Sequence, residues 1–97
     1  MAKKLIFERS VQVGGGEQVR LRLFRASSGL LVERALGQQD GRMLVQILLL
    51  LSEQDMPQLA EFQAADEHRS LLMVPYNEVL KNARAEFADS TWAREDS

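Results

Sequence analysis

The chain has 97 residues, no cysteine and a formal net charge of −2. Its length and its 45% hydrophobic and 27% charged residues predict one globular domain over residues 1–88, with 89–97 as a flexible polar tail. The lack of cysteine excludes disulfides, thiolate metal sites and cysteine nucleophiles. The start of the chain has no secretory signal, and the longest apolar run is less than half of the about 20 residues that a spanning helix needs, so we expect a cytoplasmic protein without membrane contact.

Charge is distributed unevenly along the chain. Up to Arg42 there are eight Lys and Arg residues against four Asp and Glu, and beyond it four against ten. A chain polarised in this way is expected to present a positive face on one layer and a negative face on the other.

Four apolar segments of the first half predict strands. Residues 4–13 and 17–25 alternate apolar and polar side chains, which is typical of half-buried strands, and the glycines at 14–16 between them predict a hairpin turn. Residues 30–36 form a third apolar run between glycine-containing turns. The run 43–51, apolar apart from Gln46, suits a strand buried on both faces and also a buried helix; we interpret it as the fourth strand, which closes the sheet.

Two helices are predicted in the second half. Ser52 and the acidic residues after it resemble a helix start, and Pro57 fits only a first turn, so we expect a helix near 53–67. Pro75 opens a second helix near 75–88, whose apolar residues recur at helical spacing. The expected fold is α+β: an antiparallel four-stranded meander packed on one face by two C-terminal helices, with 70–74 as a candidate fifth, edge strand.

No catalytic or metal-binding pattern is present in the sequence. His68 is the only histidine, and it stands in a polar stretch with Asp66 and Glu67 that is typical of a solvated helix end. The three glycines lack the lysine and hydroxyl of a phosphate-binding loop. We therefore expect a non-enzymatic protein that needs no cofactor and no metal.

The second predicted strand suggests a nucleic-acid surface. Period two places Arg20, Arg22 and Phe24 on one face of this strand. Guanidinium groups pair with phosphates and an exposed ring stacks on a base, which together favour binding of single-stranded nucleic acid. The full predicted set is Lys3, Lys4, Arg20, Arg22, Phe24, Arg34 and Arg42.

The alternative is a protein–protein interaction or regulatory adaptor or chaperone that acts through its acidic helices. The amphipathic second helix either covers the sheet or forms a contact with a partner or a second copy, and an aromatic residue in the polar tail is a candidate anchor. The predicted partner or dimer residues are Tyr76, Leu80, Phe87 and Trp92. A homodimer is expected because a domain of this size has a small core.

The order of parts from residue 18 to residue 62 resembles the positive-cofactor-four family of single-stranded-DNA-binding transcriptional coactivators and their whirly-type relatives. The likeness lies in the basic strand 19–25, the turn at Ser28 and Gly29, the strand 30–34, the loop 37–41, an apolar strand, and the helix start at 51–54. The resemblance implies a curved antiparallel sheet backed by helices, a dimer, and a role in transcription or replication. It also implies that Arg20, Arg22, Phe24 and Arg34 grip the nucleic acid. Family-typical lysine-rich strand ends and strand aromatics are thin in this sequence.

Overall fold

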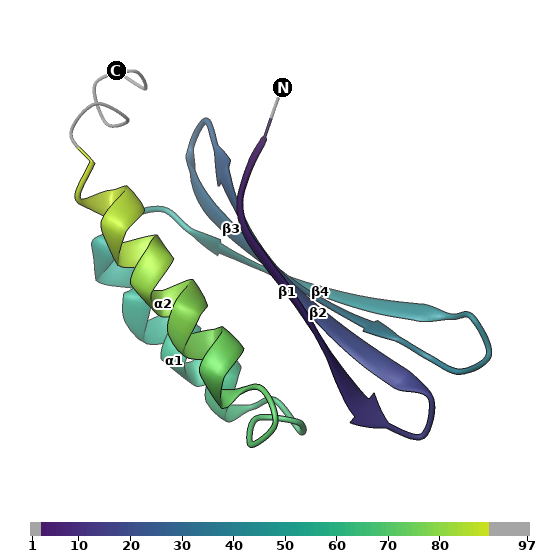
Figure 1. Cartoon of the computed structure of the whole chain (residues 1–97). Helices are drawn as coiled ribbons and strands as arrows, with labels where there is room; N and C mark the ends of the chain where they lie inside the picture. Colours follow the sequence, from purple (N-terminus) through teal and green to yellow (C-terminus); the bar gives the residue numbers. More distant parts are fainter. Residues whose placement is uncertain (1–2, 90–97) are drawn as a thin grey trace.

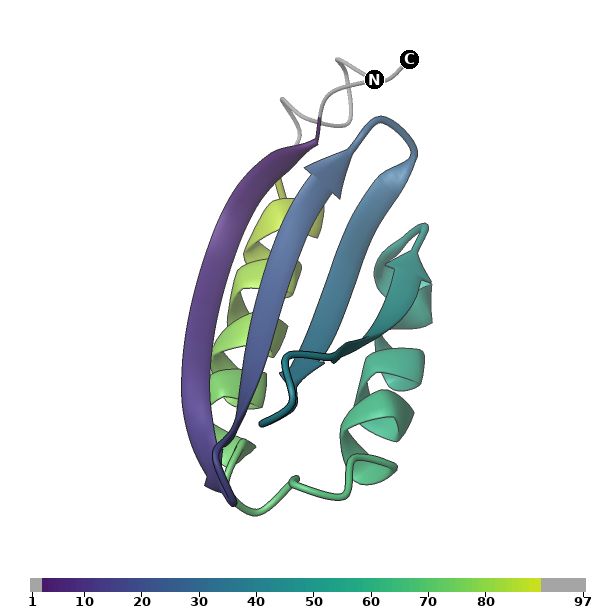
Figure 2. The ribbon, with the colours of Figure 1, turned by 90° about the vertical axis from the view of Figure 1, so that its right-hand side faces the viewer.

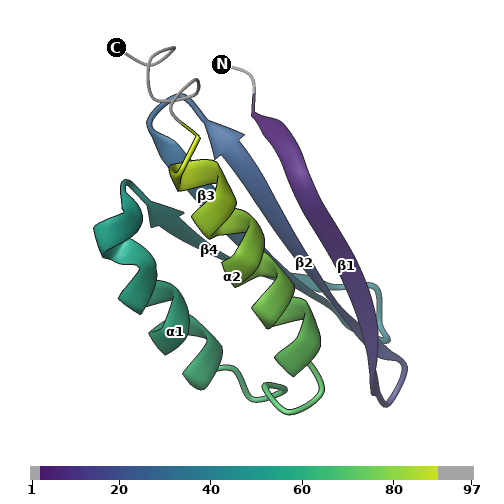
Figure 3. The same ribbon diagram turned by 60° about the vertical axis from the view of Figure 1, so that its left-hand side comes forward.

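The computed structural model describes residues 3–89, which form one sheet and two helices. The elements in chain order are β1 (Lys4–Gly14), β2 (Glu17–Ala26), β3 (Gly29–Gly37), β4 (Met43–Leu50), the short 3₁₀ helix η1 (Glu53–Asp55), α1 (Met56–Ala64) and α2 (Met73–Phe87). The strands pair antiparallel in the order β1-β2-β3-β4, and both helices lie on the same face of the sheet (Figure 1, Figure 3). The predicted α+β meander is thus confirmed.

Two details differ from the prediction. Segment 70–74 is no edge strand: it is turn up to Leu72 and then begins α2, and the described residues hold four strands only. Run 43–51 is a strand rather than a helix, but it lies at the edge of the sheet and is mostly exposed instead of buried on both faces. Among residues 3–89, neither helix has the length and apolar character to cross a membrane.

Local sequence explains where the elements turn and begin. Gly15 and Gly16 both adopt positive φ in the β1–β2 turn, as tight hairpin turns require. Ser52 accepts a hydrogen bond from the backbone N–H of Gln54, and the Asp55 side chain returns to the Ser52 backbone, so a capping box starts the helical layer. Gly29 opens β3 beside the Leu50 carbonyl, where a β-carbon would collide with that oxygen.

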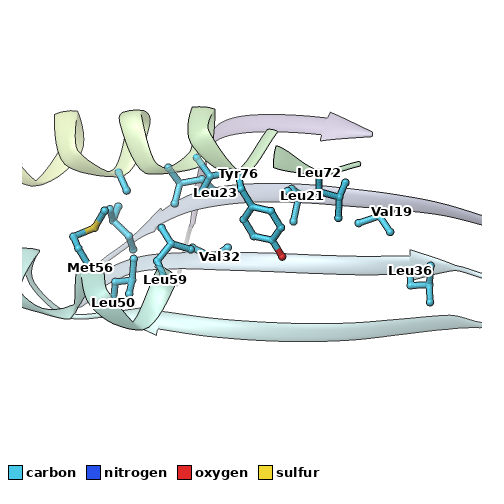
Figure 4. Packing of buried hydrophobic residues seen from close by; sticks show 13 residues of the cluster. Val19, Leu21, Leu23, Val32, Leu36, Leu50, Met56, Leu59, Leu72 and Tyr76 are labelled. Atoms are coloured by element: carbon cyan, nitrogen blue, oxygen red, sulfur yellow. The ribbon is translucent and has the colours of Figure 1, made fainter. Parts of the chain in front are cut away.

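The core lies between the sheet and the two helices. Val19, Leu21 and Leu23 of β2 are fully buried on this side, as period-two alternation predicts. Leu59 of α1 and Tyr76 of α2 close the core from the helical layer (Figure 4). We call the side of the sheet that faces the helices the helix side, and the other the outward face.

Charged residues connect the two layers. Arg9 Nη2 lies 3.0 Å from Glu78 Oε2, and Arg25 Nη1 lies 3.7 Å from Glu86 Oε1. A third pair joins Arg34 of β3 to Asp66 in the α1–α2 connection. Basic residues of the first half of the sequence therefore form ion pairs with acidic residues of the second half. These pairs neutralise part of the charge polarity within the molecule.

Candidate functional site: the outward face of the sheet

The β1–β2 half of the outward face is a lattice of ion pairs. Arg22 stands between Glu8 on β1 and Glu33 on β3 in the strand register, and its Nε donates to Glu33 Oε1 at 2.7 Å. Arg20 lies 3.9 Å from each of the same two carboxylates. Two guanidinium groups are thus balanced by two carboxylates, so the two arginines leave little net positive charge on this half of the face.

Phe24 completes this half, but its ring is not an open platform. The side chain is on the outward face, yet the residue is only 7% exposed. Lys3 Nζ lies 4.4 Å from the ring centroid and the Arg22 guanidinium carbon 5.2 Å from it. Cation–π contacts within the chain occupy the ring, so a stacking base would have to displace them.

The other predicted basic residues are not gathered with Arg20 and Arg22. Arg34 lies on the helix side, in register with Leu21, and is buried. Lys4 lies opposite Arg25 in the strand register, at a position that also belongs to the helix side. Arg42 is in the β3–β4 loop, where its Nε donates to Asp40 at 2.6 Å. The outward face therefore collects Lys3, Arg20, Arg22 and Phe24 from the predicted set.

The predicted partner residues of α2 face the sheet. Tyr76 is fully buried, and Leu80 and Phe87 are partly buried against the core. The structure gives these residues the role of covering the sheet, which was the other interpretation of the amphipathic helix. Trp92 lies outside the described residues.

Arg34 instead belongs to a buried polar cluster. Its Nε and Nη2 donate to the two oxygens of Asp66 at 2.6 and 2.9 Å, and the Tyr76 hydroxyl donates to Asp66 at 2.6 Å. The backbone N–H of His68 adds a fourth bond at 2.8 Å. The interpretation of Asp66 as solvated helix surface is therefore wrong: this carboxylate ties β3, the helix connection and α2 together.

The environment of the cluster shifts two pKa values in opposite directions. Burial by itself raises the pKa of Asp66, but the hydrogen bonds from Arg34, Tyr76 and the His68 backbone outweigh it and hold the pKa below its ordinary value. Burial and the hydrogen bond to Asp66 raise the pKa of Tyr76 far above its ordinary value. At neutral pH the cluster is thus an ionised Asp66 fully engaged with Arg34 and a neutral tyrosine, an arrangement suited to holding the layers together.

The β4 half of the outward face is apolar and open. Register places alternate residues of β4 on this face, and they are 44% to 59% exposed: Met43, Val45, Ile47 and Leu49. We call these four residues the outward strip. The sequence shows the apolar run but the prediction missed its exposure, although the last strand of a four-stranded meander necessarily lies at an edge.

A cleft of about 470 Å³ adjoins β4 on the helix side. Leu44 and Gln46 of β4 line it together with Leu36 of β3, while residues 65–67 after α1 form its opposite wall. Leu44 is 53% exposed, so apolar surface continues from the outward strip around the edge of the sheet.

Comparison with known proteins gives no match: no family model, no curated protein and no solved structure is similar enough to place the chain in a family. The likeness to the positive-cofactor-four family therefore stays a prediction. Residues 3–89 contain no group of three or more His, Cys, Asp or Glu side chains arranged to hold a metal ion.

Proposed function

We propose that the protein is a non-enzymatic protein-interaction module, and that the outward strip of β4 is its binding surface. The observation that carries the proposal is the set of four contiguous, half-exposed apolar side chains on one face of one strand. Contiguous apolar surface of this kind on a small domain is typical of sites that bind another macromolecule.

The surroundings of the strip have the composition of a protein interface. The strip itself contains no charged residue, and charged residues are depleted at the centre of protein interfaces. Beside it, the ion pairs of Arg20 and Arg22 with Glu33 supply a polar border. This surface replaces the acidic helices as the docking face, because the predicted partner residues of α2, Tyr76, Leu80 and Phe87, pack against the core between helix and sheet.

Single-stranded nucleic acid is the competing ligand. Arg20 and Arg22 keep about a third and a quarter of their side-chain surface, at 34% and 26%, so they remain within reach of phosphates. However, Glu8 and Glu33 offset their charge, and the exposed outward strip beside them is apolar. A protein surface explains both the neutral lattice and the strip, whereas a nucleic acid would leave the strip without a role.

Site-specific photo-crosslinking in cells tests the proposal. A photoreactive amino acid placed at Ile47, at the centre of the strip, should give an adduct with a different protein. The matched control is the same amino acid at Ser10, an exposed residue on the outward phase of β1, where no such adduct is expected.

The mass and nuclease sensitivity of the adduct decide between the ligands. A nuclease-resistant adduct with another protein, reproduced after purification of both chains, supports the proposal. A nuclease-sensitive adduct identifies nucleic acid as the ligand and overturns it. Adducts with copies of this chain alone would also overturn it, since they leave no external partner.

A further inference from the structure

The exposed edge of β4 lacks the features that keep sheet edges apart. Its free edge presents unpaired backbone N–H and C=O groups, which are a template for another strand. Residues Met43–Leu50 contain no charged residue and no proline, and their pairing with β3 runs without a bulge. A long apolar edge without such protection is a ready template for pairing with another strand.

We propose that a second copy of this chain pairs with β4, antiparallel, about a two-fold axis that passes through Gln46. The two four-stranded sheets would then form one continuous sheet of eight strands, with the helices of both copies on the same face. This inference deepens the proposed function, because it places two outward strips side by side on the opposite face.

The sequence of β4 is self-complementary about this axis. Residues whose numbers lie equally far before and after Gln46 face one another, and every such pair within the strand joins two apolar side chains. The pairs are Val45 with Ile47, Leu44 with Leu48, and Met43 with Leu49 of the second copy. Cross-strand pairs of this kind stabilise antiparallel sheets.

Gln46 is the only polar residue of the strand, and it lies on the axis. Its Oε1 faces Arg34 Nη1 at 3.5 Å, which leaves its amide N–H groups to donate across the axis to Gln46 of the second copy. An amide facing its own symmetry mate satisfies both groups. A polar pair among apolar neighbours also fixes the register, since a shift by one or two residues would place Gln46 against valine, isoleucine or leucine.

The helix side of β4 also fits a second copy. In the proposed register Leu48 of the second copy lies next to Leu44, at the wall of the 470 Å³ cleft. Helix α1 lies on this side, nearer β4 than β1 (Figure 2), and it carries a single charged residue, Glu61. Helix α1 therefore adds one charged residue per copy to this side, next to Glu67 in the wall of the cleft.

Charge-swapped variants test both the interface and its register. The first variant combines Val45→Lys with Ile47→Lys, and the second combines Val45→Glu with Ile47→Glu; both positions are exposed, so each variant should fold as a monomer. Sedimentation of the wild-type chain at about 100 µM should show a dimer, and each variant alone a loss of at least about tenfold in association, because like charges stand directly opposite. An equimolar mixture should restore the dimer, because the lysines of one variant then face the glutamates of the other.

The control, Ser10→Lys with Gln12→Lys, changes two exposed residues of β1 and should leave the dimer unchanged.

Each outcome decides the inference separately from the proposed function. A wild-type chain that sediments as a monomer at this concentration overturns the second copy, even if a different protein crosslinks to Ile47. A dimer that survives in both variants places the interface elsewhere and overturns it as well, provided that circular dichroism shows both variants folded. Failure of the mixture to associate more tightly than either variant contradicts the register. A dimer without any external crosslink would instead leave the inference intact and remove only the proposed function.

Discussion

The two edge strands of the sheet differ in charge and in regularity. The β1 edge carries Lys4, Glu8 and Arg9, and its pairing with β2 shifts register between Leu5 and Phe7. The β4 edge has no charged residue and no shift. Charges and bulges protect an edge from further pairing, so β1 has the features of a protected edge and β4 lacks them, which is the basis of the proposed pairing.

The two halves of the sheet, which we call the β1 side (β1 and β2) and the β4 side (β3 and β4), also differ in how the helices are attached to them. The β1 side is joined to α2 by the pair of Arg9 with Glu78, whose side chains are 48% and 34% exposed. The β4 side is joined to the helix connection by Arg34 and Asp66, which are 7% and 1% exposed. Exposed pairs contribute little to stability, whereas breaking a buried pair costs much more, so the comparison predicts unequal effects of mutation on the two sides.

The largest effect is expected from Asp66→Asn. The substitution keeps the shape of the side chain but leaves Arg34 buried without a counterion, which should lower the free energy of unfolding by about 3–5 kcal/mol. Urea unfolding at one fixed protein concentration measures the loss. Asp40→Asn is the matched control, because it removes the negative charge of the exposed pair with Arg42 and should cost less than about 1 kcal/mol. Equal losses in the two variants would contradict the structural role of Asp66.

Lowering the pH should remove the stabilisation by ionised Asp66 without a mutation. Because the pKa of Asp66 is lowered in the folded protein, its stabilisation is complete above the unfolded value of about 3.9 and disappears as pH falls through the folded value. The difference in stability between the wild type and Asp66→Asn should therefore be constant near neutral pH and shrink below about pH 4. Urea titrations of both proteins across this range check it, and a difference that stays undiminished down to the lowest pH would contradict a lowered pKa of Asp66.

Gly29→Ala should weaken the β4 side through the backbone. An added β-carbon would collide with the Leu50 carbonyl at the point where β3 begins and β4 ends, and overpacking of this kind costs about 1–3 kcal/mol. Gly37→Ala is the control at the other end of β3, since its β-carbon would approach no atom closer than 3.8 Å. Thermal unfolding compares the two, and a Gly29→Ala protein as stable as Gly37→Ala would show that the strands part at no cost.

The sequence predicts the strands, the helices and the position of Arg20 and Arg22 on the outward face, because these features depend on local alternation and helix caps. The same alternation contained a signal that was missed: Arg34 is in phase with Leu30, Val32 and Leu36, which places it on the helix side.

The partners of these residues are a different matter. Asp66 is 32 residues away from Arg34 in sequence, and no local pattern indicates that the helix connection returns to β3. The neutral balance of the outward face likewise depends on strand register, which sets Glu8 and Glu33 on either side of Arg22. Contacts between distant segments decide the site, whereas local periodicity decides only the elements.

The smallest effect is expected on the β1 side from Glu78→Gln, which removes the negative charge opposite Arg9. Both side chains remain in contact with water, so the pair should contribute about 0–1 kcal/mol, and the loss should decrease further as salt rises. Urea unfolding of wild type and variant at low and high salt measures both quantities. A loss as large as that of Asp66→Asn would mean that the β1 side depends on its ion pair as strongly as the β4 side does. The inferred difference between a weak, exposed ion pair on the β1 side and a strong, buried ion pair on the β4 side would then be wrong.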